Sequence, residues 1–337
     1  MDRKINPSEI KSVLISRTDN IGDVILTLPL VYMASCVFSN AKIFFHVNER
    51  LKPLLNGMSM NVNILTEDEH QNYKDKKKLF AVHDIDLAIF ARPRFDLALL
   101  FFQLRTKHRV GTAYRWYSFL YNLRVKEHRK FADKHESEYN LNLLREFVET
   151  DKNCRVPERL LNYDESERAH FRERAETFGL SPETKYIIIH PGSRGSARDI
   201  SLEQFREIGI KLLAAHPDYK IVYTGLESEK EIVNNSMPNE NKDRVVNLAG
   251  KLSLRELMIL IDQSKLFMSN STGPIHIAGA LNKNIIGFYP NSAPVNDTRW
   301  KPLGQNAVII KPSDRSDNMS LIDVNEAVSS AGRQLKI

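Results

Sequence analysis

The sequence predicts an α/β protein made of two doubly wound domains. Short apolar, β-branched runs alternate with helical patterns along most of the 337 residues, and such alternation is typical of parallel sheets with right-handed crossovers. A chain of this length also exceeds the usual size of a single domain. Residues 150–184 contain no apolar strand. We therefore expect this segment to connect two separate sheets.

The expected elements follow the chain in order. In the first half we expect strands at 11–16, 41–47 and 84–90 and helices at 22–38, 94–104 and 136–149. In the second half we expect strands at 185–190, 220–225, 244–249, 265–270, 283–289 and 306–311 and helices at 201–215, 227–235, 253–263 and 273–281. The predicted domain plan is a first domain at 1–160, a connection at 161–184, a second domain at 185–318 and a terminal helix at 319–337 that packs back on the first domain.

Composition restricts the class of protein. With 42% hydrophobic and 27% charged residues, the chain has the composition of a globular protein. Cys36 and Cys154 are the only cysteines, so we expect no disulfide framework, no zinc site and a reducing, cytoplasmic location. The N-terminus lacks the apolar segment of a secretory signal. The longest apolar tract, 24–38, is too short to span a bilayer, so any membrane contact is expected to be peripheral.

Basic residues are concentrated between Arg105 and Lys130. This segment holds eight Lys or Arg residues against one acid, Glu127. Its aromatic residues include Trp116, Tyr117, Phe119 and Tyr121. Such a mixture favours an anionic partner, which could be a phosphorylated glycolipid, a membrane surface or nucleic acid. The alternative is a solvated surface segment that has no partner.

Gly22 and Asp23 lie where the first predicted strand gives way to a helix. A carboxylate at a helix start can accept hydrogen bonds from free backbone N–H groups and complement the helix dipole. Open α/β folds also bind their ligands at the carboxyl ends of strands. Asp23 is therefore either a capping residue or a catalytic carboxylate.

Two turns in the second half suit an anion. The strand at 185–190 runs into a loop with Gly, Ser193 and Arg194, before a helix that opens at Ser201. The strand at 265–270 runs into Ser271, Thr272 and Gly273 at the start of another helix. Hydroxyl groups and free amides at a helix start suit a diphosphate, and glycine permits close approach. His276 lies on the first turn of that helix and either meets a ligand or packs in the core.

The motifs together resemble those of glycosyltransferase family 9, the heptosyltransferases that add ADP-activated heptose to the lipopolysaccharide inner core. The resemblance extends from about residue 12 to about residue 304. It is carried by IGDVILTLPL, IIIHPGSRGSARDISLEQF, YTGLESE, NLAGKLSLRELMILI, SNSTGPIHIAGAL, Pro294 and RWKPLG. It implies the GT-B fold, with two Rossmann-like domains facing across a cleft, the acceptor mainly on the first and the nucleotide sugar on the second.

The resemblance also implies roles for individual residues. Asp23, in the family's glycine-aspartate pair with Gly22, corresponds to the general base of an inverting transfer. Arg198 stands where the family commonly has a Lys that stabilises the leaving diphosphate. The other residues expected at the nucleotide sugar are Ser193, Arg194, Glu229, Gly250, Ser271, Thr272, Gly273 and His276, with Leu248 and Ala249 shaping the base pocket. No metal and no cofactor are implied.

Two departures bear on the donor. Arg198 keeps the positive charge of the family's Lys, but its planar guanidinium can donate two parallel hydrogen bonds where the lysine ammonium is a point charge. Ser271 replaces an Asp that many members have before Thr-Gly, which weakens the expectation that the donor sugar is a heptose.

The expected partners are ADP-heptose, an anionic glycolipid acceptor and the cytoplasmic face of the inner membrane. One alternative is a related enzyme with another nucleotide sugar or acceptor. A second is a nucleotide-sugar-binding module without turnover. Nucleic-acid binding ranks last, because only the basic segment favours it.

Overall fold

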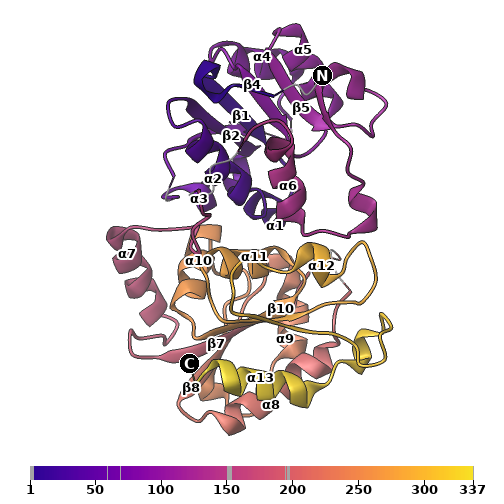
Figure 1. Ribbon diagram of the computed structural model, residues 1–337. Helices are drawn as coiled ribbons and strands as arrows, with labels where there is room; N and C mark the ends of the chain where they lie inside the picture. The colour runs from indigo at the N-terminus through magenta and orange to yellow at the C-terminus, as the bar shows by residue number, and fades with distance from the viewer. Residues whose placement is uncertain are drawn as a thin grey trace. The chain divides into compact units, whose positions relative to one another are not determined.

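The computed structural model describes residues 4–58, 60–68, 70–149, 154–193, 195 and 198–336. The chain forms two compact units, Met1–Pro157 and Glu158–Ile337, and each contains a six-stranded sheet (Figure 1). The segment predicted as a connection, 161–184, belongs to the second unit. Its helix α7 (Glu165–Glu176) begins with a capping box formed by Asp164 and Glu167. Glu167 also accepts hydrogen bonds of 2.6 and 2.7 Å from Arg255 of the same unit.

The first unit is a doubly wound parallel sheet with the strand order β3-β2-β1-β4-β5-β6. Its strands are β1 (Ser12–Ser16), β2 (Lys42–Asn48), β3 (Asn63–Glu67), β4 (Leu87–Phe90), β5 (His108–Thr112) and β6 (Leu123–Val125). Its helices are α1 (Ile21–Ile25), α2 (Leu28–Val37), α3 (Lys52–Leu55), α4 (Tyr73–Ala81), α5 (Phe95–Gln103) and α6 (Glu136–Arg145). The order reverses between β1 and β4, and this switch point is where such sheets bind ligands at their carboxyl ends.

The second unit repeats this topology with the order β12-β11-β10-β7-β8-β9. Its strands are β7 (Lys185–His190), β8 (Tyr219–Tyr223), β9 (Val245–Asn247), β10 (Leu266–Asn270), β11 (Ile285–Phe288) and β12 (Ala307–Ile310). Its further helices are α8 (Leu202–Ala215), α9 (Lys230–Ser236), α10 (Leu254–Gln263), α11 (Gly273–Ala280), α12 (Asp297–Trp300) and α13 (Val324–Gln334). The reversal lies between β7 and β10, so the two predicted anion-binding turns leave adjacent strand ends.

The sheet of the second unit is covered on both faces. Figure 1 shows α10 and α11 on one face and α8 and α13 on the other. β7 is buried from Tyr186 to His190, as expected for a central strand that both helical layers cover. α8 begins with a capping box between Ser201 and Gln204, which fixes the point where the preceding loop ends.

The terminal helix corrects one prediction. We expected it to pack on the first domain, but α13 packs within the second unit. Val324, Ala327 and Ala331 form one apolar stripe that joins the core beneath β11 and β12. The apolar face of this helix is buried against the sheet of its own unit. The prediction that it packs on the first domain is therefore wrong.

The cysteines correct another expectation. Cys36 of α2 and Cys154 form a disulfide, with 6.1 Å between their Cα atoms. They are 118 residues apart in the sequence, and only the fold of the first unit brings them together. In the described part of the chain, no helix combines the length and the apolarity needed to cross a bilayer.

Candidate functional site

In the first unit, Asp23 lies beside the carboxyl end of β1. The N-cap of α1 is Asn20, so Asp23 belongs to the first turn and is not the cap. Its side chain is 15% exposed, and its Oδ1 accepts a hydrogen bond from Arg17. The carboxylate is therefore held by a guanidinium group, and its backbone carbonyl accepts a further bond of 2.8 Å from Thr27. Gly22, beside it in α1, is buried.

Arg17 is the centre of a buried charge network. Its Nε donates to Asp19 at 2.8 Å, and its Nη1 donates to Glu136 at 3.1 Å and to the carbonyl oxygen of Ala91 at 3.2 Å. Both Arg17 and Glu136 are almost completely buried. Paired donors and acceptors of this kind restrict the guanidinium to one orientation. Arg17 therefore presents a fixed positive charge to Asp23.

The environment of Asp23 raises the pKa of its carboxyl group above the ordinary value. Loss of solvent is the main cause, the nearby positive charge of Arg17 opposes it, and the negative charges of Asp19 and Glu136 add to it. A carboxylate with a raised pKa is a stronger base once it is ionised. The first unit thus provides a partly exposed, oriented carboxyl group at its topological switch point.

In the second unit, the loop after β7 is held at both ends by Asn270. This residue ends β10 and is completely buried. Its Nδ2 donates to the carbonyl oxygen of Pro191 at 3.0 Å, and its Oδ1 accepts from the N–H of Ile200 at 3.2 Å. Asn270 therefore links the two ends of the predicted anion-binding loop to the neighbouring strand.

This loop also has internal hydrogen bonds. Ser193 donates to Asp199 at 2.7 Å and accepts from the N–H of Gly195 at 3.2 Å. Burial raises the pKa of Asp199 to about 6. Arg194 lies outside the described residues.

A cavity of about 600 Å³ lies against the loop, within the usual size range of small-molecule sites. Its lining residues include Pro191, Gly192, Ser193, Asp199, Ser228 and Glu229. Glu229 is 4% exposed and accepts a hydrogen bond of 2.8 Å from the N–H of Leu226. A Cβ at position 192 would lie 2.4 Å from Oε1 of Glu229. Gly192 is thus needed for the buried carboxylate to occupy this position.

Arg198 is 55% exposed and available to a ligand at the edge of the same loop. Its Nη1 lies 2.8 Å from Oδ2 of Asp317. Asp317 in turn accepts hydrogen bonds of 2.9 Å from the N–H groups of Asn291 and Ser292. The hydroxyl of Ser292, which also donates to Asp317, holds the pKa of this carboxyl group below its usual value, and the backbone bonds and Arg198 add to the effect. Asp317 therefore links Arg198 to Asn291 and Ser292, which lie in the loop that follows β11.

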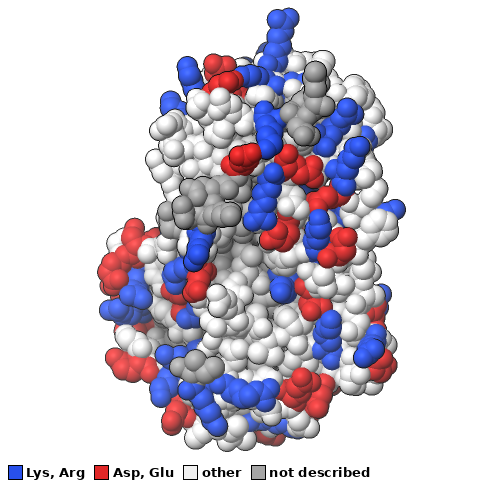
Figure 2. All heavy atoms as spheres, viewed as in Figure 1, with Lys and Arg blue, Asp and Glu red and all other residues white. Residues whose placement is uncertain are grey.

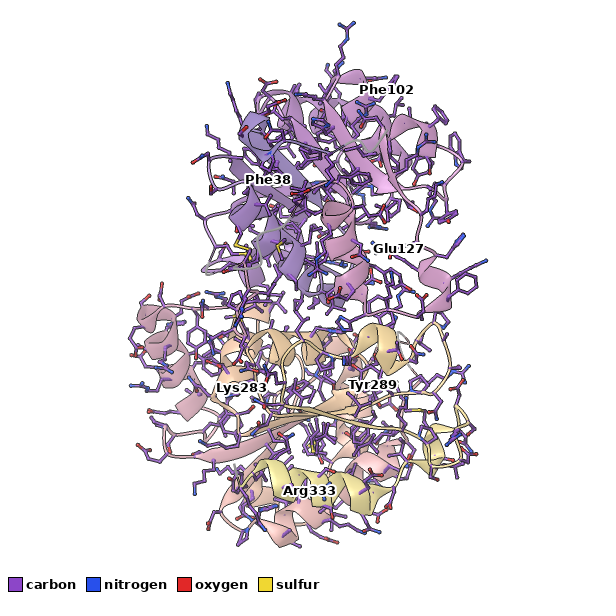
Figure 3. The ribbon with its side chains drawn as sticks, viewed as in Figure 1. Phe38, Phe102, Glu127, Lys283, Tyr289 and Arg333 are labelled. Carbon is purple, nitrogen blue, oxygen red and sulfur yellow. A yellow bond between two sulfur atoms is a disulfide. The ribbon has the colours of Figure 1, made fainter. Side chains whose placement is uncertain are left out.

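The residues at the start of α11 differ in their surroundings. Thr272 is the N-cap, yet its side chain makes no capping hydrogen bond, so the first amides of α11 are not occupied by it. Ser271 is half-buried. Tyr289 lies inside the second unit in Figure 3, and its hydroxyl donates to the carbonyl oxygen of Trp300 at 2.9 Å. A helix start of this kind favours a negatively charged group.

Two further predicted residues are placed by packing and backbone geometry. His276 is 3% exposed, which agrees with the alternative that it packs in the core. Gly250 follows β9 and has a φ of 71°, a conformation that favours glycine, and its N–H donates to Gly225 at 2.9 Å. Leu248 and Ala249 before it are buried.

Several site residues were missed from the sequence. Arg17 and Glu136 are charged, and charged residues are normally assigned to the surface. Asn270 was recognised only as the end of a strand. His190, at the end of β7, bonds to Thr224 at 2.9 Å, and burial lowers its pKa to about 4. For Arg17, Asn270 and His190 the available signal was a polar side chain at or next to the carboxyl end of an apolar strand. Glu136 opens α6 and had no such signal.

Three comparisons place these units among known proteins. The sequence profile of glycosyltransferase family 9 (heptosyltransferase) matches residues 75–325. A Haemophilus influenzae protein named "Putative glycosyltransferase" is 28% identical over 339 residues, covering 95% of each chain. A family 9 glycosyl transferase structure from Veillonella parvula has a TM-score of 0.82 at 17% identity, covering 100% of this chain and 99% of that one. The structure of E. coli ADP-heptose lps heptosyltransferase II has a TM-score of 0.76 at 23% identity. The match covers 97% of this chain and 99% of that chain.

Proposed function

The chain belongs to glycosyltransferase family 9 and has the GT-B fold, and we propose that it transfers heptose from ADP-heptose to a lipopolysaccharide inner-core or related glycolipid acceptor. The observation that carries this proposal is the placement of Asp23, oriented by Arg17 at the carboxyl end of β1. Such a carboxylate suits removal of a proton from an acceptor hydroxyl.

In the proposed reaction the acceptor oxygen attacks the anomeric carbon as its proton moves to Asp23. The bond from the anomeric carbon to the diphosphate oxygen breaks, and the nucleoside diphosphate leaves with the electron pair. A single displacement of this kind inverts the anomeric configuration. The positive charge of Arg17 favours the ionised form of Asp23 and so opposes the effect of burial on its pKa.

The second unit is proposed to bind the donor and stabilise the leaving group. Negative charge grows on the diphosphate as the bond breaks, and the helix start at Gly273 together with the guanidinium of Arg198 offers positive charge to it. Glu229 is proposed to accept hydrogen bonds from ribose hydroxyls. Because Arg198 and the start of α11 can supply the positive charge that the leaving group needs, we propose transfer without a metal.

We propose that the reaction takes place at the cytoplasmic face of the inner membrane. The Cys36–Cys154 disulfide is a feature that is rare in a reducing cytoplasm. Neither cysteine belongs to the sites described above.

The residue at position 271 bears on the identity of the donor sugar. Ser271 offers a neutral hydroxyl, so it does not reproduce the carboxylate that many family members have at this position. A different nucleotide sugar is therefore the second candidate, and a binding module without turnover is the third.

A thermal-shift panel of ADP, UDP, GDP and CMP is expected to single out ADP. A ligand at 100 times its dissociation constant stabilises the native state by about 2.7 kcal/mol, which gives a clear rise in Tm. Selectivity for UDP or GDP would discard ADP-heptose and retain the enzyme class. The lack of any response would contradict the donor site.

Asn270→Ala is expected to weaken ADP binding about tenfold, or about 1.4 kcal/mol. The change removes both hydrogen bonds that hold Pro191 and Ile200, so the loop loses its fixed position. Titration calorimetry with ADP measures this effect. Ser236→Ala serves as the control, because Ser236 is also buried and bonded, at 2.8 Å to Val233, but does not contact the loop. Equal affinities in the two variants would contradict the role of Asn270.

A further inference from the structure

The first unit carries a cluster of exposed aromatic side chains at the β6 edge of its sheet. Trp116 is 73% exposed and Phe119 is 67% exposed. Of the exposed large apolar side chains in the described part of the chain, half lie between residues 95 and 131: Phe95, Phe102, Tyr114, Trp116, Phe119 and Phe131. Concentrated exposure of this kind marks an interaction surface, whereas single exposed apolar residues need no explanation.

The turn that carries Trp116 and Phe119 is held by the buried residue Ser118. Its Oγ donates to the carbonyl oxygen of Thr112 at 2.7 Å and accepts from the N–H of Arg115 at 2.9 Å. The ring of Trp116 also packs against Phe95, with 4.8 Å between the ring centroids. The aromatic side chains are therefore displayed by an ordered turn.

A second aromatic group follows along the same segment. Tyr114 stacks on His128 with 3.5 Å between ring centroids, and His128 contacts Phe131 at 5.7 Å. Lys130 lies over the ring of Phe131 at 5.0 Å. These contacts connect the turn after β5 to the segment after β6, which together form one margin of the unit (Figure 1).

Exposed basic side chains occur along the same segment of the chain. They are Arg105, Arg115, Arg124, Lys126 and Lys130. Among the described residues, none of these five is within ion-pair distance of a carboxylate. The single acid of the 105–130 segment, Glu127, is paired with Lys134. Figure 2 shows basic side chains along this margin of the unit.

We propose that this aromatic–basic surface, made of Tyr114, Trp116, Phe119, Phe131, Arg115, Arg124, Lys126 and Lys130, docks on an anionic lipid bilayer. Tryptophan and phenylalanine rings enter the interface between headgroups and acyl chains. Lysine and arginine side chains next to them meet the negative headgroups, each adding to the attraction. A protein partner is less suited, because the centres of protein interfaces are depleted in charge, and in lysine above all.

This surface deepens the proposed location at the inner membrane and rests on that part of the proposed function, but it does not depend on the sugar or the donor. Its use is clear if the acceptor is a glycolipid, since docking would bring the first unit to the bilayer that contains it. The binding test below includes neither donor nor acceptor. Its result is therefore independent of the result of any transfer assay.

The test uses the emission of Trp116 in the full chain. The chain has two tryptophans, so Trp300→Phe leaves Trp116 as the single reporter. On addition of vesicles of phosphatidylcholine and phosphatidylglycerol, we expect its emission to shift to shorter wavelength and to be quenched by brominated lipid. Pure phosphatidylcholine vesicles are expected to give a much weaker response, and added salt to reverse the binding.

Two variants and a matched control, made in the otherwise unchanged chain, complete the test by vesicle sedimentation. Trp116→Ala with Phe119→Ala, and separately Arg124→Glu with Lys126→Glu, are each expected to weaken binding at least tenfold. Arg172→Glu with Lys242→Glu changes the net charge equally in the second unit, at exposed sites, and is expected to bind more tightly than the first-unit charge variant. Unchanged Trp116 emission, or equal weakening in the control, would overturn the proposal. Binding to single-stranded RNA without binding to vesicles would overturn it as well and assign the surface to nucleic acid.

Discussion

Asp23→Asn is expected to lower kcat for sugar transfer by a factor of about 10²–10⁴ and to leave donor binding unchanged. The amide retains an oxygen that can accept from Arg17, so the local structure is kept, but it cannot take a proton from the acceptor. Steady-state release of ADP measures kcat, and calorimetry measures donor affinity. Asp19→Asn is the matched control, because Asp19 accepts from the same guanidinium at 2.8 Å. A similar loss in both variants would show that the charge network, not the base, was disturbed.

The same residue gives the reaction its expected pH dependence. A base must be deprotonated to act, so kcat should rise as the pH rises through the pKa of Asp23. Burial raises this pKa, and the acidic limb should therefore lie above pH 3.9, the ordinary value of an aspartate. A rate that does not change with pH across the acidic range in which the enzyme stays folded would contradict the assignment.

Arg198→Ala is expected to lower kcat by a factor of about 10²–10³, because it removes a positive charge from the leaving diphosphate. Arg198→Lys should retain more activity than the alanine variant, since it keeps the charge and loses only the bidentate geometry. The side chain is 55% exposed and its described ion pair is with Asp317, so folding should be little affected. Arg172→Ala, at an exposed position in α7, is the control for loss of an arginine. If Arg198→Ala and Arg172→Ala have equal rates, Arg198 does not act on the leaving group.

Much of the fold could be predicted because its central strands are continuous apolar runs. β1, β4 and β10 are buried along their length, and β7 is buried from Tyr186 to His190; buried parallel strands have this pattern. The elements that were missed lie toward the edges of the first sheet. β3 is half-exposed with the sequence NILTE, β6 has three residues, and α4 contains four lysines in YKDKKKLFA. Short or polar elements of this kind carry little hydrophobic periodicity.

The candidate site could be predicted as a set of strand ends but not as a network. Asp23, Ser193 and Thr272 were each recognised from the turn that contains them. Arg17 and Asn270 were not recognised, because their importance depends on contacts with residues distant in the sequence. Asn270 holds a loop about 75 residues away from it in the chain, and such a pairing is visible only once β7 and β10 are placed side by side.

The most direct test of glycosyl transfer is mass spectrometry of a reaction containing the enzyme, ADP-heptose and a heptose-deficient lipopolysaccharide acceptor. We expect an acceptor product heavier by one heptose residue, released ADP in equal amount, and far less of both products in the same time with Asp23→Asn. Transfer from a different nucleotide sugar would keep the enzyme class and replace the donor. Tight binding of ADP by the wild-type protein without transfer from any nucleotide sugar would contradict the account and support a binding protein.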